Sequence, residues 1–137
     1  MKVLIDTNIL ISAMLKRSSI PAAAYSKAAE LPYECLLCDY CIDEFSRVIR
    51  KKMPGLIKDA ESFLAKALVA ARVISAPSDT EAVSEEAAIR DVKDHPVVRA
   101  AVKAKADIIL TGDRDFLESG IKKPMMLSPS EFLAFKK

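Results

Sequence analysis

The chain has 137 residues, the usual size of one domain, and 51% of them are hydrophobic, which excludes a disordered polar tail. The formal net charge of +2 gives no overall basic field, so any binding of nucleic acid has to depend on a local arrangement of charges. No apolar run approaches the roughly 20 residues of a membrane span, and Asp6 interrupts the apolar N-terminus where a signal peptide needs a continuous run, so we expect a single cytoplasmic domain over residues 1–137.

Short apolar runs alternate with amphipathic stretches along the whole chain. In chain order, the sequence predicts a strand over residues 2–5, helices over 9–15 and 21–30, a strand over 34–38, helices over 41–52 and 56–71, a strand over 72–76, a helix over 96–105, a strand over 107–111 followed by a turn over 112–115, a strand over 125–127 and a helix over 129–135. Alternating helices and fully apolar strands indicate an α/β fold, a three-layer α/β/α sandwich with a mainly parallel central sheet. Ligands of such sheets bind beyond the carboxyl ends of the strands.

Three polar residues, Asp6, Thr7 and Asn8, follow the first predicted strand directly. All three residue types are favoured as helix caps. Because one helix start needs only one cap, we expect Asp6 to belong to a functional site, while Thr7 and Asn8 are candidates for either role.

Glu44 lies in the helix after the second strand. At about 100° per residue, it falls at the margin of the predicted buried stripe, which comprises Ile42, Phe45, Val48 and Ile49. A carboxylate at this margin can lean over the edge of the sheet. Arg47 and Lys51 lie on the same side and can contact phosphates, although a solvated basic face is the alternative.

Further acids flank the later elements. Asp94 precedes the helix predicted from residue 96, and Asp91 competes with it for a functional role. Asp113 and Asp115 follow the strongest predicted strand, DIILT, at a glycine turn. Helix capping is the alternative for each of them, but two acids at this spacing beside a glycine are more typical of metal ligands.

Four separate segments would thus bring carboxylates to one edge of the sheet, where they repel one another unless a cation is bound. Ligands that are all oxygen select a hard ion, so the sequence predicts Mg²⁺ or Mn²⁺. The spacing of Cys35, Cys38 and Cys41 suggests zinc. However, the chain has a single histidine and no further cysteine, so we expect these thiols to be reduced and part of the core.

Three stretches of the sequence together resemble a known family. The opening KVLIDTNIL, an acidic residue on a mid-chain helix and the late ADIILTGDRDF are similar to the PIN domain, and most of all to the prokaryotic toxin components of toxin–antitoxin systems. The resemblance covers nearly the whole chain, including the closing LSPSEFL. It implies a parallel sheet between helices, Mg²⁺- or Mn²⁺-dependent endoribonuclease chemistry, a homodimer and inhibition by an antitoxin.

By position, the resemblance assigns catalytic acids to Asp6, Glu44, Asp94 and Asp113. The residues expected to hold metal are Asp6, Asp94, Asp113 and, as an additional acid, Asp115. Supporting hydrogen bonds are expected from Thr7, Asn8 and Thr111, and contacts with RNA from Arg47 and Lys51. The His95-Pro96 pair after Asp94 departs from the family's pattern, which leaves the direction of the Asp94 carboxylate open.

The predicted activity is therefore hydrolysis of RNA phosphodiesters, with two alternatives. A phosphohydrolase that uses Asp6 as a covalent nucleophile would have a second Asp two positions later, where this chain has Asn8. A catalytically inactive PIN-like scaffold that binds RNA or protein would have lost acids, and all four are present.

Overall fold

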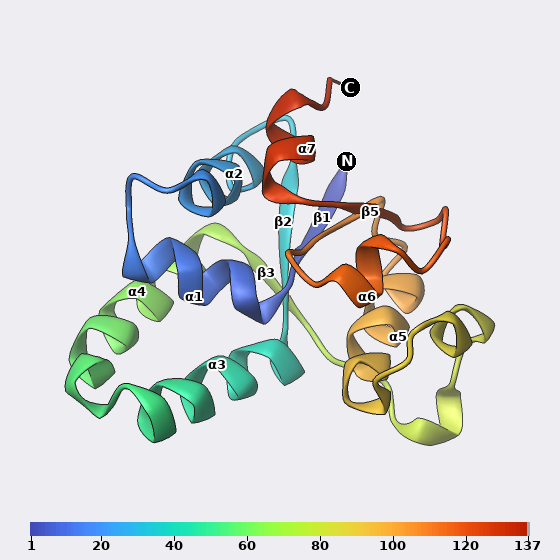
Figure 1. Cartoon of the computed structure of the whole chain (residues 1–137), viewed down its shortest axis with the longest axis horizontal. Helices are drawn as coiled ribbons and strands as arrows, with labels where there is room; N and C mark the ends of the chain where they lie inside the picture. Colours follow the sequence, from blue (N-terminus) through green and yellow to red (C-terminus); the bar gives the residue numbers. More distant parts are fainter. Residues whose placement is uncertain (137) are drawn as a thin grey trace.

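Five parallel strands form the centre of the computed structural model, which describes residues 1–136 (Figure 1). The strands are β1 (Lys2–Ile5), β2 (Glu34–Cys38), β3 (Arg72–Ile74), β4 (Ile108–Leu110) and β5 (Met125–Leu127). Their order across the sheet is β3-β2-β1-β4-β5, and each neighbouring pair is parallel. The expected α/β sandwich with a parallel sheet is confirmed.

Helices cover both faces of the sheet, which explains why its strands are apolar throughout. Val3 and Ile5 of β1 point into one core, whereas Leu4 points into the other, and all three are fully buried. The first core is closed by α1 (Thr7–Leu15), α2 (Ile20–Ala28), α4 (Ile57–Ala70) and α7 (Pro129–Ala134). The second is closed by α5 (His95–Lys103) and α6 (Arg114–Leu117), and α3 (Asp39–Lys52) contributes to both.

The chain order of the strands creates a switch point at the carboxyl edge of the sheet. From β1 the chain moves through β2 to β3 on one side, and it then returns to place β4 on the other side of β1. Consequently, α1 leaves the end of β1 on one side, while the segment after β4 leaves on the other (Figure 1). Open parallel sheets bind their ligands at this kind of point.

The predicted strands and helices are present, with shifted ends. β1, β2 and β5 have the predicted bounds, but β3 and β4 are shorter than predicted, and α1 and α3 each begin two residues earlier than predicted. The prediction of a turn over 112–115 is wrong in its second half, because Arg114 and Asp115 already belong to α6. The buried stripe of α3 includes Cys41, whereas Ile42 and Val48 are only half-buried, because Cys41 packs into the second core.

A long irregular segment, residues 75–94, joins β3 to α5 through three short 3₁₀ helices, η2 (Asp79–Glu81), η3 (Ser84–Ala88) and η4 (Val92–Asp94). Arg99 of α5, which is 3% exposed, holds this segment. Its guanidinium donates to both carboxylate oxygens of Glu86, at 3.0 and 2.8 Å, and to the Pro77 carbonyl and the Asp79 carboxylate, each at 3.0 Å. A buried charge paired in this way fixes the conformation of the segment around it.

No helix within residues 1–136 is both long enough and apolar enough to cross a membrane.

Candidate active site

The ends of β1 and β4 place Asp6 beside Thr111. Ile5 and Leu110 are partners in the sheet, and the Asp6 amide continues the pairing by donating to the Leu110 carbonyl at 3.0 Å. The hydroxyl of Thr111 donates to Asp6 Oδ2 at 2.8 Å, and both side chains are buried. The first acid of the site is therefore held at the switch point between the two strands.

Asp6 is also the N-cap of α1, since its Oδ1 accepts from the Thr7 amide at 2.8 Å. Burial raises the pKa of Asp6 to about 6; the hydrogen bonds from Thr111 and Thr7 oppose this rise, and the charges of Glu44 and Asp113 add to it. A cap in solvent would have no such shift. Asp6 thus combines a capping role with a place in a group of interacting carboxylates.

Asp113 is connected to Asp6 through Thr111. The Asp113 amide donates to the Thr111 hydroxyl at 3.0 Å, and Asp113 Oδ1 accepts from the Asp115 amide at 2.9 Å as the N-cap of α6. The neighbouring Gly112 amide donates to Asn8 Oδ1 at 3.4 Å, which ties the start of α1 to the loop after β4. Thr111 and Asn8 therefore link the segment after β1, which carries Asp6, to the segment after β4, which carries Asp113.

Asp94 differs from these two acids because, within residues 1–136, its carboxylate makes no capping hydrogen bond although it is the N-cap of α5. The pKa of Asp94 rises to about 7, first because of burial and then because of the charges of Asp6, Asp113, Asp91 and Glu44. The Asp94 side chain thus faces the other acids without a hydrogen bond that stabilises its charge. Asp91, the competing acid, accepts from the Lys93 amide at 3.0 Å as the N-cap of η4.

Glu44 completes the group from α3. Its side chain is half-buried, and its charge raises the pKa of both Asp6 and Asp94. Four segments that are distant in the sequence therefore bring Asp6, Glu44, Asp94 and Asp113 within electrostatic reach of one another. We refer to these four residues as the acid cluster.

Three other predicted site residues make different contacts. The carboxylate of Asp115 binds the guanidinium of Arg90. The Thr7 hydroxyl donates to the Cys41 carbonyl at 3.4 Å, which joins α1 to α3. Arg47 pairs with Asp43 at 3.1 Å on the exposed side of α3, where Lys51 is exposed as well.

The donor set of the acid cluster fits a hard cation, because it consists of carboxylates and has an excess of negative charge. Among residues 1–136, no group of three or more His, Cys, Asp and Glu side chains is already arranged so that it could hold a metal ion. Cys35, Cys38 and Cys41 are free and buried, and Cys35 lies in a different core from the other two. The expectation of reduced core thiols is confirmed.

Two residues with contacts near the cluster are absent from the sequence prediction. Tyr40, in the first turn of α3, donates its hydroxyl to the Lys93 carbonyl at 2.5 Å. Arg99 lies on the buried face of α5. A charged residue among the apolar residues of that face could have indicated a buried ion pair in the sequence. No local pattern pointed to Tyr40.

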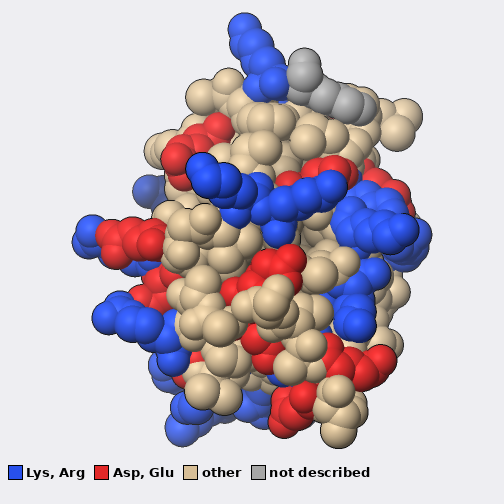
Figure 2. Space-filling model, turned by 90° about the vertical axis from the view of Figure 1, so that its right-hand side faces the viewer, with Lys and Arg blue, Asp and Glu red and all other residues tan. Residues whose placement is uncertain are grey.

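The surface around α5 and α6 mixes both signs of charge. Figure 2 shows Asp and Glu side chains gathered near the middle of this face, with Lys and Arg side chains above them and on both sides. Exposed basic residues of these elements and their flanking loops include Arg90, Lys93, Arg114, Lys122 and Lys123.

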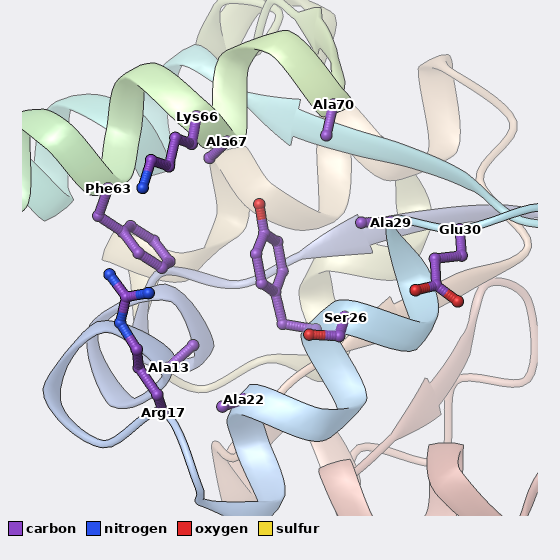
Figure 3. A pocket seen from close by; sticks show the side chains of 11 residues that line it. Ala13, Arg17, Ala22, Ser26, Ala29, Glu30, Phe63, Lys66, Ala67 and Ala70 are labelled. Atoms are coloured by element: carbon purple, nitrogen blue, oxygen red, sulfur yellow. The ribbon is translucent and has the colours of Figure 1, made fainter.

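A groove of about 460 Å³ lies between α1, α2 and α4, and none of the four acids lines it. Alanines such as Ala22 and Ala67 form much of its wall, and Arg17 and Lys66 extend toward the ring of Phe63 (Figure 3). Exposed apolar side chains occur on the same three elements and their connections, namely Leu15, Ile20, Leu68 and Val69.

Comparison with known protein families assigns the chain to one family. A family model described as PIN domain matches residues 2–115, which is most of the chain. No curated protein matches the sequence significantly.

Solved structures of similar fold are distant in sequence. VapBC2 from Rickettsia felis, bound to a DNA fragment from its promoter, is 14% identical with a TM-score of 0.70, over 93% of this chain and 98% of that chain. PAE2754 from Pyrobaculum aerophilum is 17% identical with a TM-score of 0.70, over 97% and 87%. VapC20 from Mycobacterium tuberculosis, described as a sarcin–ricin loop cleaving toxin, is 15% identical with a TM-score of 0.60, over 87% and 95%. At these identities the similarity shows the fold alone.

The raised pKa values predict that the metal-free protein loses stability as the pH rises. Above about pH 4 the unfolded chain releases the protons of Asp6 and Asp94, whereas the folded chain keeps them until about pH 6 and 7. The free energy of unfolding should therefore fall between about pH 4 and 7, by on the order of 1–3 kcal/mol, because solvent reduces the contribution of the half-buried Asp94. The lowered pKa of Glu86 acts mainly below this range.

Urea unfolding in EDTA across this pH range measures the effect. Asp6→Asn and Asp94→Asn should each reduce the pH dependence, and Asn retains the capping ability at position 6. Asp59→Asn, at an exposed position of α4, is the control and should leave the slope unchanged. Identical slopes in all four proteins would contradict the charge repulsion inferred for the acid cluster.

Proposed function

Because the chain belongs to the PIN-domain family, as its sequence predicted, we propose that it is a metal-dependent endoribonuclease that hydrolyses RNA phosphodiesters. One feature supports the proposal: Asp6, Glu44, Asp94 and Asp113 come from four segments near the switch point of a parallel sheet, where burial, and to a smaller extent the charges of these acids, raises the pKa of Asp6 and Asp94. Such repulsion is unfavourable for stability alone and is relieved by a cation.

The residues that would hold Mg²⁺ or Mn²⁺ are Asp6, Asp94, Asp113 and, after release from Arg90, Asp115. The chemistry that such an ion supplies is polarisation of the phosphate and activation of a water molecule. The hydrogen bond from Thr111 holds Asp6 Oδ2, and the Thr7 amide holds Oδ1, so Asp6 keeps a fixed orientation. Asp94 has no competing cap contact, and Glu44, at the margin of α3, would complete the cluster or orient the attacking water.

Cleavage of single-stranded RNA should require Mg²⁺ or Mn²⁺ and should stop in excess EDTA. We expect Glu44→Gln and Asp94→Asn to lower kcat by about 100-fold or more, because each removes a group placed at the reacting phosphate. Glu61→Gln, at an exposed position of α4, is the control and should keep the wild-type kcat. Equal cleavage in EDTA would rule out the metal-dependent mechanism. A folded wild type that cleaves no RNA with either ion would favour the catalytically inactive scaffold.

The phosphates of an RNA substrate are bound by basic side chains, and α3 carries such side chains close to Glu44. Lys51 follows Glu44 by seven residues, two helical turns, and therefore lies on the same face. Arg47 pairs with the exposed Asp43, and exposed pairs are weak enough to exchange for a phosphate. We propose that Arg47 and Lys51 contact the RNA backbone.

The double variant Arg47→Ala/Lys51→Ala should weaken RNA binding about equally for different sequences. The slope of log K against log salt should flatten by about 0.7 for each phosphate that the variant no longer neutralises. Lys103→Ala/Lys122→Ala removes the same charge from exposed positions of α5 and the loop after α6, and should keep the wild-type slope. Equal slopes in both variants would show that the α3 residues form only a solvated face.

We further propose that the chain is a cytoplasmic single-domain toxin that an antitoxin inhibits. The similar structures VapBC2 from Rickettsia felis and FitAB were each determined bound to DNA. On this chain, the groove between α1, α2 and α4 and the exposed apolar residues on these three helices are features of the kind that protein partners cover. A homodimer is the second assembly proposed, and the same surface is available to it.

Val69, which is 89% exposed on α4, gives the test for this surface. Co-expression with the protein encoded by the neighbouring gene should yield a complex that no longer cleaves RNA. Val69→Glu should weaken that complex without reducing RNA cleavage by the free chain. Leu133→Glu, at an exposed position of α7, is the control. Loss of a homodimer instead of the complex in Val69→Glu, measured by light scattering, would assign the surface to a second copy.

A further inference from the structure

Asp94 reaches the acid cluster from residues 75–94, a segment without strand or α-helix. Because its carboxylate makes no capping hydrogen bond, the position of Asp94 depends on the contacts that hold its backbone. One set of contacts ties the segment to α5. Arg99 binds Pro77, Asp79 and Glu86 of the segment, and the ring of His95 lies 2.8 Å from the Ile89 carbonyl.

A second set of contacts ties the segment to the first turn of α3. Asp39 Oδ1 accepts from the Ala76 amide at 2.9 Å, close to the start of the segment. The Tyr40 hydroxyl donates to the Lys93 carbonyl at 2.5 Å, one residue before Asp94. The segment is therefore attached to α3 at both of its ends.

The phenol of Tyr40 also lies close to the acids. Burial raises the pKa of Tyr40, and the charges of Glu44 and Asp94 raise it further. Tyr40 and Glu44 are four residues apart on α3 and thus on one face of the helix. The hydrogen bond to Lys93 consequently spans the distance between the helix that carries Glu44 and the segment that carries Asp94.

We propose that Tyr40 is a positioning residue of the acid cluster: through its hydrogen bond to the Lys93 carbonyl, it sets the spacing between Glu44 and Asp94. The consequence for catalysis rests on the proposed function, since the ligands of a bound Mg²⁺ or Mn²⁺ ion must lie within about 0.2 Å of their ideal distances. Arg99 and His95 cannot replace this contact, because they attach the segment to α5 and not to α3.

Tyr40→Phe tests the inference because it keeps the ring and removes only the donor. In the metal-free protein, amide hydrogen exchange should become severalfold faster at Asp94, whose amide donates to the Asp91 carbonyl, while Ala101 within α5 stays protected. Tyr33→Phe is the matched control, since it removes a hydroxyl from a tyrosine that packs against Phe132 on α7. It should leave exchange at Asp94 unchanged.

Titration with Mn²⁺, followed by electron paramagnetic resonance, gives a second readout. We expect Tyr40→Phe to bind Mn²⁺ about tenfold more weakly, as is usual for residues that orient ligands, and to lower kcat for RNA with KM unchanged. If the amide of Asp94 exchanges at the same rate in Tyr40→Phe as in the wild type, the inference is wrong. It is also wrong if exchange becomes faster while the affinity for Mn²⁺ is unchanged. If the wild type binds no Mn²⁺, the proposed function fails, and faster exchange at Asp94 still supports the positioning role.

Discussion

The hydrogen bond from Thr111 to Asp6 joins the ends of β1 and β4, and the arrangement of the acid cluster depends on it. It holds a buried carboxylate at the one place where the chain order of the sheet reverses. The Thr111 hydroxyl also accepts from the Asp113 amide, so one hydroxyl contacts two acids that follow different strands. Its stabilising effect on the charge of Asp6 is smaller than the effect of burial, since the pKa of Asp6 still rises to about 6. Protonation of Asp6 is therefore easier in the folded chain than in the unfolded chain.

Helix capping and ligand placement are not alternatives in this fold. Asp6 and Asp113 each use Oδ1 for the amide that starts the next helix. A carboxylate that accepts one amide keeps further lone pairs for other partners. The strand-to-helix junctions of a parallel sheet consequently supply acids whose orientation is fixed by the backbone itself. Asp94 lacks such a contact, and its orientation has to come from the segment before it.

The sequence was sufficient for the five strands, for the longer helices and for the position of acids at their ends, because these depend on local patterns. It did not predict α6 or the short helices η2, η3 and η4. Strands that are apolar throughout indicated a sheet covered on both faces. Asp6 follows β1 directly, and Asp113 comes three residues after the end of β4. Strand order, and with it the switch point, depends on pairing between residues far apart in the chain, such as Ile5 with Leu110. The pairing of Asp115 with Arg90 joins residues 25 positions apart, and the bond from Tyr40 to Lys93 spans 53. No periodicity encodes contacts of this kind.

An acid carried by an irregular segment costs more conformational entropy to fix than one at the end of a strand. The contacts of residues 75–94 offset that cost: Arg99 and Glu86 form a buried pair on the α5 side, and Asp39 and Tyr40 attach both ends to α3. The position of Asp94 thus depends on side-chain contacts between distant parts of the chain, whereas Asp6 and Asp113 are oriented by the backbone amides of the helices that they cap.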